Sequence, residues 1–130
     1  MSFSLSLKVR DYECDVQGIV NNAIYQYCLE HARHGYLLSH GLNFAKITRL
    51  GIVIVMARTE LDYRKSLQAG DEFQVTVKAA RPTPVRLVFE QSILHELNAP
   101  PIFEARIICT AVNAVGRPYF PEQLADLVDG

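Results

Sequence analysis

A change in hydrophobic period divides this chain into one helical segment and several strand-like segments. Between residues 22 and 40, apolar side chains recur at intervals of three and four: Tyr25, Leu29, Ala32 and Tyr36. This spacing places them on one face of a helix. Residues 3–10 instead alternate apolar and polar side chains, which is typical of a half-buried strand.

The ends of the predicted helix carry recognisable signals. Asn21 or Asn22 is placed to cap its start, and Gly41 is a natural stop. Further apolar residues widen the stripe, so we expect most of the helix to be buried: Ile24, Cys28, Leu37 and Leu38. Gly35 costs about 1 kcal/mol relative to alanine in a helix. We therefore expect another element to pack closely against it.

Four more strands are predicted after a loop near residues 41–50. They cover residues 52–64, 72–80, 85–97 and 102–115, and are separated by turns at 66–71, 81–84 and 98–101. The first begins as a continuous apolar run, which predicts burial at that end. Short turns between consecutive strands favour an antiparallel meander. Residues 121–128 predict a short helix with Pro121 at its first position.

This order of elements predicts an α+β protein of the hotdog fold, in which a strongly curved antiparallel sheet wraps around one long central helix. The length of 130 residues suits a single domain over 1–130. The sheet would have an exposed edge strand, which is a liability unless it is paired. Pairing of that edge between two copies would give a continuous sheet and a homodimer.

Charge and composition exclude several classes of function. The net charge is -1 and no basic stripe occurs, which argues against nucleic-acid binding. The three cysteines show no CxxC spacing, as expected for a reducing compartment without a zinc site. The start lacks the features of a signal peptide, and the apolar run GIVIVMA is too short to span a membrane. A cytoplasmic location is expected.

A short loop ahead of the predicted helix contains the candidate catalytic residues. In the segment CDVQGIVNNAIYQYCLEHAR, Asp15 stands just ahead of the helix, where backbone amides lack internal acceptors and the helix dipole is positive. Hydrolysis of an acyl group needs a nucleophile or general base and a donor for the developing oxyanion. Asp15 and those amides supply both. The alternative is that Asp15 only forms a turn.

Two segments resemble the acyl-CoA thioesterases of the hotdog fold, in the 4-hydroxybenzoyl-CoA thioesterase group. They are DVQGIVNNAIYQYCLEHAR and ELDYRKSLQAGDEF, and KVRDYECDVQGIVNNAIY is also similar to plant acyl-lipid (methylketone synthase) thioesterases. The resemblance implies that Asp15 is the catalytic acid and that the backbone N–H of Asn22 polarises the carbonyl. It also implies an acyl-CoA or acyl carrier protein substrate, no cofactor, and a homodimer or homotetramer.

Eight further residues are expected to contact the substrate: Gly18, Ile19, Tyr25, Val55, Met56, Ala57, Arg81 and Arg86. Gly18 permits a tight turn or a close ligand approach. Tyr25 shapes the acyl pocket or, alternatively, fills the core. The acyl chain would lie between the central helix and the partner subunit, in an apolar groove lined by residues such as Val53 to Ala57. Arg81 and Arg86 flank a turn and are candidates for binding phosphate or an acidic carrier.

Several alternatives stay open at this point. Many members of the family carry His where this chain has Ile19, and the absence of that proton donor argues against hydratase chemistry. A non-catalytic acyl-thioester binding protein on the same fold is the main alternative, and an enoyl thioester hydratase is a weaker one. His31 and His34 lack a third ligand for a metal. Glu30 and Arg33 are expected to form an ion pair, either within the helix or across a dimer.

Overall fold

The computed structural model describes residues 3–128, with the exception of the Phe44 side chain. Its elements are β1 (Phe3–Lys8), a 3₁₀ turn η1 (Asp11–Glu13), α1 (Asn22–Ser39), α2 (Phe44–Arg49), β2 (Val53–Tyr63), β3 (Glu72–Ala80), β4 (Arg86–Leu94), β5 (Phe103–Val112), β6 (Pro118–Tyr119) and a 3₁₀ helix η2 (Glu122–Leu127). One strand, one long helix and then a series of strands follow one another as predicted.

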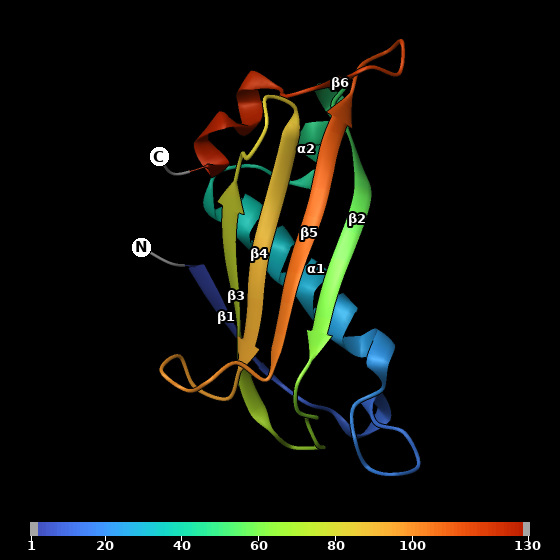
Figure 1. Cartoon of the computed structure of the whole chain (residues 1–130), viewed down its shortest axis with the longest axis vertical. Helices are drawn as coiled ribbons and strands as arrows, with labels where there is room; N and C mark the ends of the chain where they lie inside the picture. The colour runs from blue at the N-terminus through green and yellow to red at the C-terminus, as the bar shows by residue number, and fades with distance from the viewer. Residues whose placement is uncertain (1–2, 129–130) are drawn as a thin grey trace.

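The strands form one antiparallel sheet in the order β1-β3-β4-β5-β2, and β6 pairs with β5. Helix α1 crosses one face of this sheet obliquely, and the core fills the space between them (Figure 1). The α+β hotdog architecture predicted from the order of elements is therefore confirmed. Because alternate strand residues point to opposite faces, β3, β4 and β5 each direct every second side chain toward this core.

The predicted meander is correct for β3, β4 and β5 but wrong for β2. Strand β2 pairs with β5 at the far edge of the sheet, from Val53 opposite Val112 to Tyr63 opposite Phe103. Residues 64–71 therefore form a connection that crosses the end of the sheet, where a hairpin turn was expected (Figure 1). This connection is held by Leu67, which is buried and whose carbonyl accepts from Val20 N at 2.9 Å.

The expected burial of the apolar start of β2 is also wrong. Val53 is 54% exposed and Met56 is 52% exposed, because β2 is an edge strand with only β5 beside it. A β-bulge between Met56 and Arg58 shifts the register halfway along the strand. The sheet therefore presents a long, apolar edge, which is the feature that natural sheets usually cover.

Helix α1 buries a narrower face than predicted. The four residues of the stripe are buried together with Leu37, whereas Ile24 and Cys28 are half-buried and Leu38 is 60% exposed. The close approach at Gly35 is confirmed, since a Cβ placed there would lie 3.2 Å from Phe3 Cζ. The central helix is thus packed on the sheet along one side and open along the other.

The helices are capped or ended by residues whose side chain or backbone conformation suits that position. Asn21 is the N-cap of α1 and Gly41 follows its end with φ +74°. The loop expected at residues 41–50 is wrong, because Asn43 caps a short helix there by accepting from Lys46 N at 2.7 Å. Near the end of the chain, Pro121 is the N-cap of η2 and lies just outside that helix.

Candidate active site

The Asp15 loop is a small hairpin. Cys14 pairs with Val20 in an antiparallel bridge, and Asp15 N donates to Ile19 O at 2.9 Å. At the tip, the Asp15 carboxylate accepts from Gln17 N at 2.8 Å through one oxygen, and Gly18 has φ +81°. This positive φ accounts for the glycine by backbone conformation. Asp15 therefore forms the turn, and its carboxylate is exposed and oriented by a main-chain donor.

Helix α1 begins one residue after this hairpin. Asn21 N donates to Glu13 O at 2.9 Å, which joins the hairpin to the helix, and the Asn21 side chain accepts from Ala23 N at 3.0 Å. Within residues 3–128, the Asn22 amide donates to no protein acceptor. A free amide at the positive end of an 18-residue helix is suited to hold a developing oxyanion. The Asn21 side chain, rather than Asn22, does the capping.

The ring of Tyr25 lies in the core beneath this hairpin. It is 2% exposed and stacks on Phe103 with ring centroids 5.1 Å apart. Burial is the main cause that raises the pKa of its hydroxyl, which accepts from Leu67 N at 2.9 Å. Tyr25 is thus a core aromatic, the alternative that the sequence left open. Ile19 is half-buried and pairs with Gln68 in a bridge.

An apolar groove lies between α1 and the first half of β2, within one chain. It has a volume of about 210 Å³ and is lined by Glu30, Arg33, His34, Leu37, Ile54, Met56, Phe89 and Cys109. Of the three β2 residues expected to contact substrate, Met56 lines this groove. Val55 pairs with Thr110 and alternates with the inward Ile54, so it lies on the outer face, and Ala57 lies at the bulge.

Arg81 and Arg86 lie at the other end of the sheet from the Asp15 loop. They flank the connection between β3 and β4 at the top of Figure 1, whereas the hairpin of residues 14–20 is at the bottom. The Arg81 side chain donates to Pro84 O at 2.8 Å and stacks over Phe120, and both arginines are exposed. One chain therefore does not bring the predicted site residues into one cluster.

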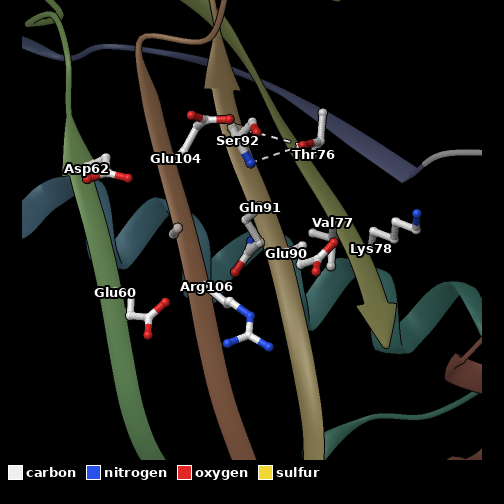
Figure 2. Close-up of a pocket in the computed structure, with 11 residues that line it drawn as sticks. Glu60, Asp62, Thr76, Val77, Lys78, Glu90, Gln91, Ser92, Glu104 and Arg106 are labelled. Carbon is white, nitrogen blue, oxygen red and sulfur yellow. Dashed lines mark hydrogen bonds between the residues drawn. The ribbon is translucent and has the colours of Figure 1, made fainter. Parts of the chain in front are cut away.

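The outer face of the sheet, remote from α1, carries a polar depression of about 570 Å³ (Figure 2). Four of its lining residues are acidic, namely Glu60, Asp62, Glu90 and Glu104, and two are basic, namely Lys78 and Arg106. An excess of negative charge disfavours phosphate groups and acidic carriers. A ligand that carries phosphate groups is therefore poorly matched by this depression.

The Glu30–Arg33 ion pair expected within the helix is wrong. Glu30 instead pairs with His34 at 3.6 Å, one helical turn further along α1. Arg33 turns inward, and its Nη1 donates to Gln91 Oε1 at 2.9 Å. Gln91 in turn donates to Leu29 O at 3.0 Å and is 2% exposed. The sequence signal for this arrangement is a polar residue at an inward position of β4, between the buried Phe89 and Ile93.

Residues 3–128 contain no group of three or more His, Cys, Asp or Glu side chains that could hold a metal ion. None of the helices in the described part of the chain is long and apolar enough to cross a membrane. The three cysteines, Cys14, Cys28 and Cys109, are free thiols. Burial is the main cause that raises the pKa of each thiol, so none of them is an activated nucleophile.

A curved antiparallel sheet packed on one long helix defines the class of hotdog-fold proteins. The chain belongs to the thioesterase-like superfamily, whose family model matches residues 9–128. The resemblance inferred from the two sequence motifs is therefore confirmed.

Curated relatives and solved structures agree with this membership. The chain is 34% identical over 114 residues to the chloroplastic acyl-acyl carrier protein thioesterase ATL3 of Arabidopsis thaliana, covering 88% of this chain and 60% of that protein. For ATL2 of the same plant the identity is 36% over 102 residues, covering 78% and 54%. The chain thus spans little more than half the length of these two relatives.

Among solved structures, a hypothetical protein of Aquifex aeolicus superposes with a TM-score of 0.87 at 25% identity, covering 98% of this chain and 99% of that one. The 1,4-dihydroxy-2-naphthoyl-CoA thioesterase of Synechocystis superposes with a TM-score of 0.89 at 15% identity, covering 98% and 96%. The second likeness supports the fold alone.

Proposed function

We propose that this protein hydrolyses acyl thioesters of coenzyme A or acyl carrier protein to a free carboxylic acid and a thiol. In this proposal the Asp15 carboxylate acts as general base or nucleophile, and the Asn22 amide donates to the oxyanion. Water supplies the hydroxyl of the acid and the proton of the thiol. No cofactor enters the reaction.

The observation that carries this proposal is the unpaired Asn22 amide directly after the Asp15 hairpin. The Asn21 side chain accepts from the Ala23 amide and, among residues 3–128, no protein acceptor takes the Asn22 amide at the positive end of the helix. One oxygen of Asp15 is held by Gln17 N, which fixes the carboxylate without using its second oxygen. Removal of one such oxyanion donor usually raises the activation free energy by about 2.7–4 kcal/mol.

The proposal includes a homodimer paired along β2. Tyr63, at the end of β2, donates to Asn22 O at 3.3 Å, so the Asp15 hairpin and the groove near Met56 lie toward opposite ends of this strand. Antiparallel pairing of β2 with a second copy would set the end of one strand beside the start of the other. The Asp15 hairpin of one protomer would then approach the groove of its partner.

Replacement of Asp15 by asparagine tests this proposal with little risk to the fold. Asparagine keeps an oxygen that accepts from Gln17 N, so the hairpin is retained while the charge is lost. Against a panel of acyl-CoAs and acyl carrier proteins, we expect Asp15→Asn to lower kcat/KM by at least about 10²-fold. Asp11→Asn is the matched control, since Asp11 is also an exposed acid nearby and its replacement should leave the rate unchanged.

Each of the other possible outcomes would indicate a different site or function. Full activity in Asp15→Asn would show that the catalytic acid is elsewhere. Binding of acyl thioesters without turnover by the unmodified protein would favour an accessory binding protein. Addition of water to an enoyl thioester would revive the hydratase alternative.

A further inference from the structure

The groove between α1 and β2 is lined mainly by apolar side chains, together with the Glu30–His34 pair and one further cation, Arg33. Leu37, Ile54, Met56, Phe89 and Cys109 form its walls, and Arg33 is half-buried among them. The volume of about 210 Å³ is smaller than the roughly 300–1,000 Å³ of complete ligand sites. The groove therefore suits one part of a ligand, and its walls suit hydrocarbon.

The guanidinium of Arg33 is held in place by two successive hydrogen bonds that lead into the core. Gln91 accepts from Arg33 at 2.9 Å and donates to Leu29 O at 3.0 Å, so its amide is oriented by a helix carbonyl. Among residues 3–128, no carboxylate forms an ion pair with Arg33, and Glu30 is paired with His34. Burial lowers the pKa of Arg33, although a guanidinium remains charged in proteins.

We propose that Arg33 is a specificity-determining residue that marks the far end of the acyl site and limits the length of acyl chain accepted. This inference rests on the proposed thioesterase function. A chain that ends before Arg33 would contact only the apolar walls. A longer chain would bring methylene groups against the guanidinium and remove the water that satisfies its remaining N–H donors.

The physical basis is the cost of desolvating a charge that cannot be neutralised. A guanidinium has five N–H donors, and the single bond to Gln91 leaves the rest dependent on solvent. Burying unpaired N–H donors beside hydrocarbon is unfavourable. A site therefore discriminates strongly against any ligand that leaves its polar groups without partners. In the proposed dimer the Asp15 hairpin of one protomer approaches the groove of its partner, so the acyl chain would enter that groove from outside and meet Arg33 where its guanidinium bonds the buried Gln91.

Two variants of Arg33 test the inference with straight-chain acyl-CoAs of increasing length. Arg33→Met keeps an unbranched side chain and removes the charge. Arg33→Gln removes the charge but keeps a hydrogen-bonding partner for Gln91, which protects the fold if the first variant does not fold. For chains longer than those preferred by the unmodified protein, we expect kcat/KM relative to short chains to rise by about tenfold in both.

Arg33→Lys and Arg117→Met are the controls. Lysine retains the charge and should retain the length limit, whereas Arg117 is exposed in a surface turn and its replacement should leave the length profile unchanged. Thermal melting of each variant establishes that it is folded. An unchanged length profile in folded Arg33→Met and Arg33→Gln would overturn the inference alone. Failure of the unmodified protein to hydrolyse any acyl thioester would overturn the proposed function and this inference with it.

Discussion

The hydroxyl of Tyr25 accepts a hydrogen bond from the backbone N–H of Leu67 at 2.9 Å, inside the core. This bond joins the first turn of α1 to the connection that carries the chain from β2 across to β3. The hairpin before α1 is held to the same connection, since Val20 N donates to Leu67 O at 2.9 Å. The Asp15 loop is thus fixed to the end of the sheet through one buried residue.

Tyr25→Phe should lower the free energy of unfolding by about 1–3 kcal/mol, because it leaves the buried Leu67 N–H without an acceptor. Urea denaturation measures this change. Tyr63→Phe is the matched control, since that hydroxyl is exposed and its bond to Asn22 O is longer, at 3.3 Å. Equal losses in the two variants would contradict a special role for the buried bond.

Asn21→Ala should remove the cap of α1 and lower the free energy of unfolding by about 0.5–2 kcal/mol. Because the cap orients the first turn, we also expect lower turnover of acyl thioesters. Asn43→Ala removes the corresponding cap of α2 and should cost stability without affecting turnover. A similar loss of turnover in both variants would mean that the α1 cap has no particular effect on the oxyanion donor.

Gly35→Ala should change the free energy of unfolding little, and Gly35→Val should lower it. Alanine gains about 1 kcal/mol of helix propensity over glycine. That gain is offset because the added Cβ would lie 3.2 Å from Phe3 Cζ. Valine adds two more methyl groups at this contact, and overpacking of this kind usually costs about 1–3 kcal/mol. Chemical denaturation of both variants checks the order; a valine variant as stable as the alanine variant would contradict the close contact.

Val53→Lys combined with Val55→Lys should convert the proposed homodimer into monomers. Both side chains are exposed on the edge strand β2, and lysines on a strand edge oppose pairing with another strand. Sedimentation equilibrium measures the association. The matched control carries two lysines at exposed residues outside the strands, Leu97→Lys and Val115→Lys, and should associate like the unmodified protein. A monomeric unmodified protein would contradict pairing along β2.

Alkaline pH should destabilise the protein partly through Cys28. Burial, and to a lesser degree the Glu13 carboxylate, raises the pKa of this thiol from 9.0 to about 11. The unfolded chain therefore loses the thiol proton at a lower pH than the folded chain does, and stability falls as pH rises from about 9 to about 11. Urea denaturation of the protein and of Cys28→Ala across this range measures the effect. The difference between them should be constant below pH 9 and shrink above it; a constant difference throughout would contradict the raised pKa.

Several features follow from short-range chemistry and were predictable from the amino-acid sequence. The buried stripe of α1, its Asn21 cap and the close contact at Gly35 depend on spacing and residue type within a few positions. The order of strands and helix was sufficient to predict the hotdog fold. The placement of Asp15 just ahead of a free helix amide was equally visible, because both belong to one short segment.

Other features arise between residues that are distant in the chain. The position of β2 at the far edge beside β5 and the exposure of its apolar start have no local signature. The polar Gln91 at an inward position of β4 indicates a buried hydrogen bond, but nothing local identifies its partner Arg33, 58 positions away. Strand order depends on which remote edges pair, and the partner of a charged side chain depends on how the helix is rotated against the sheet. Periodicity along a segment reveals which side of it is apolar, whereas its neighbours are set by the packing of the whole chain.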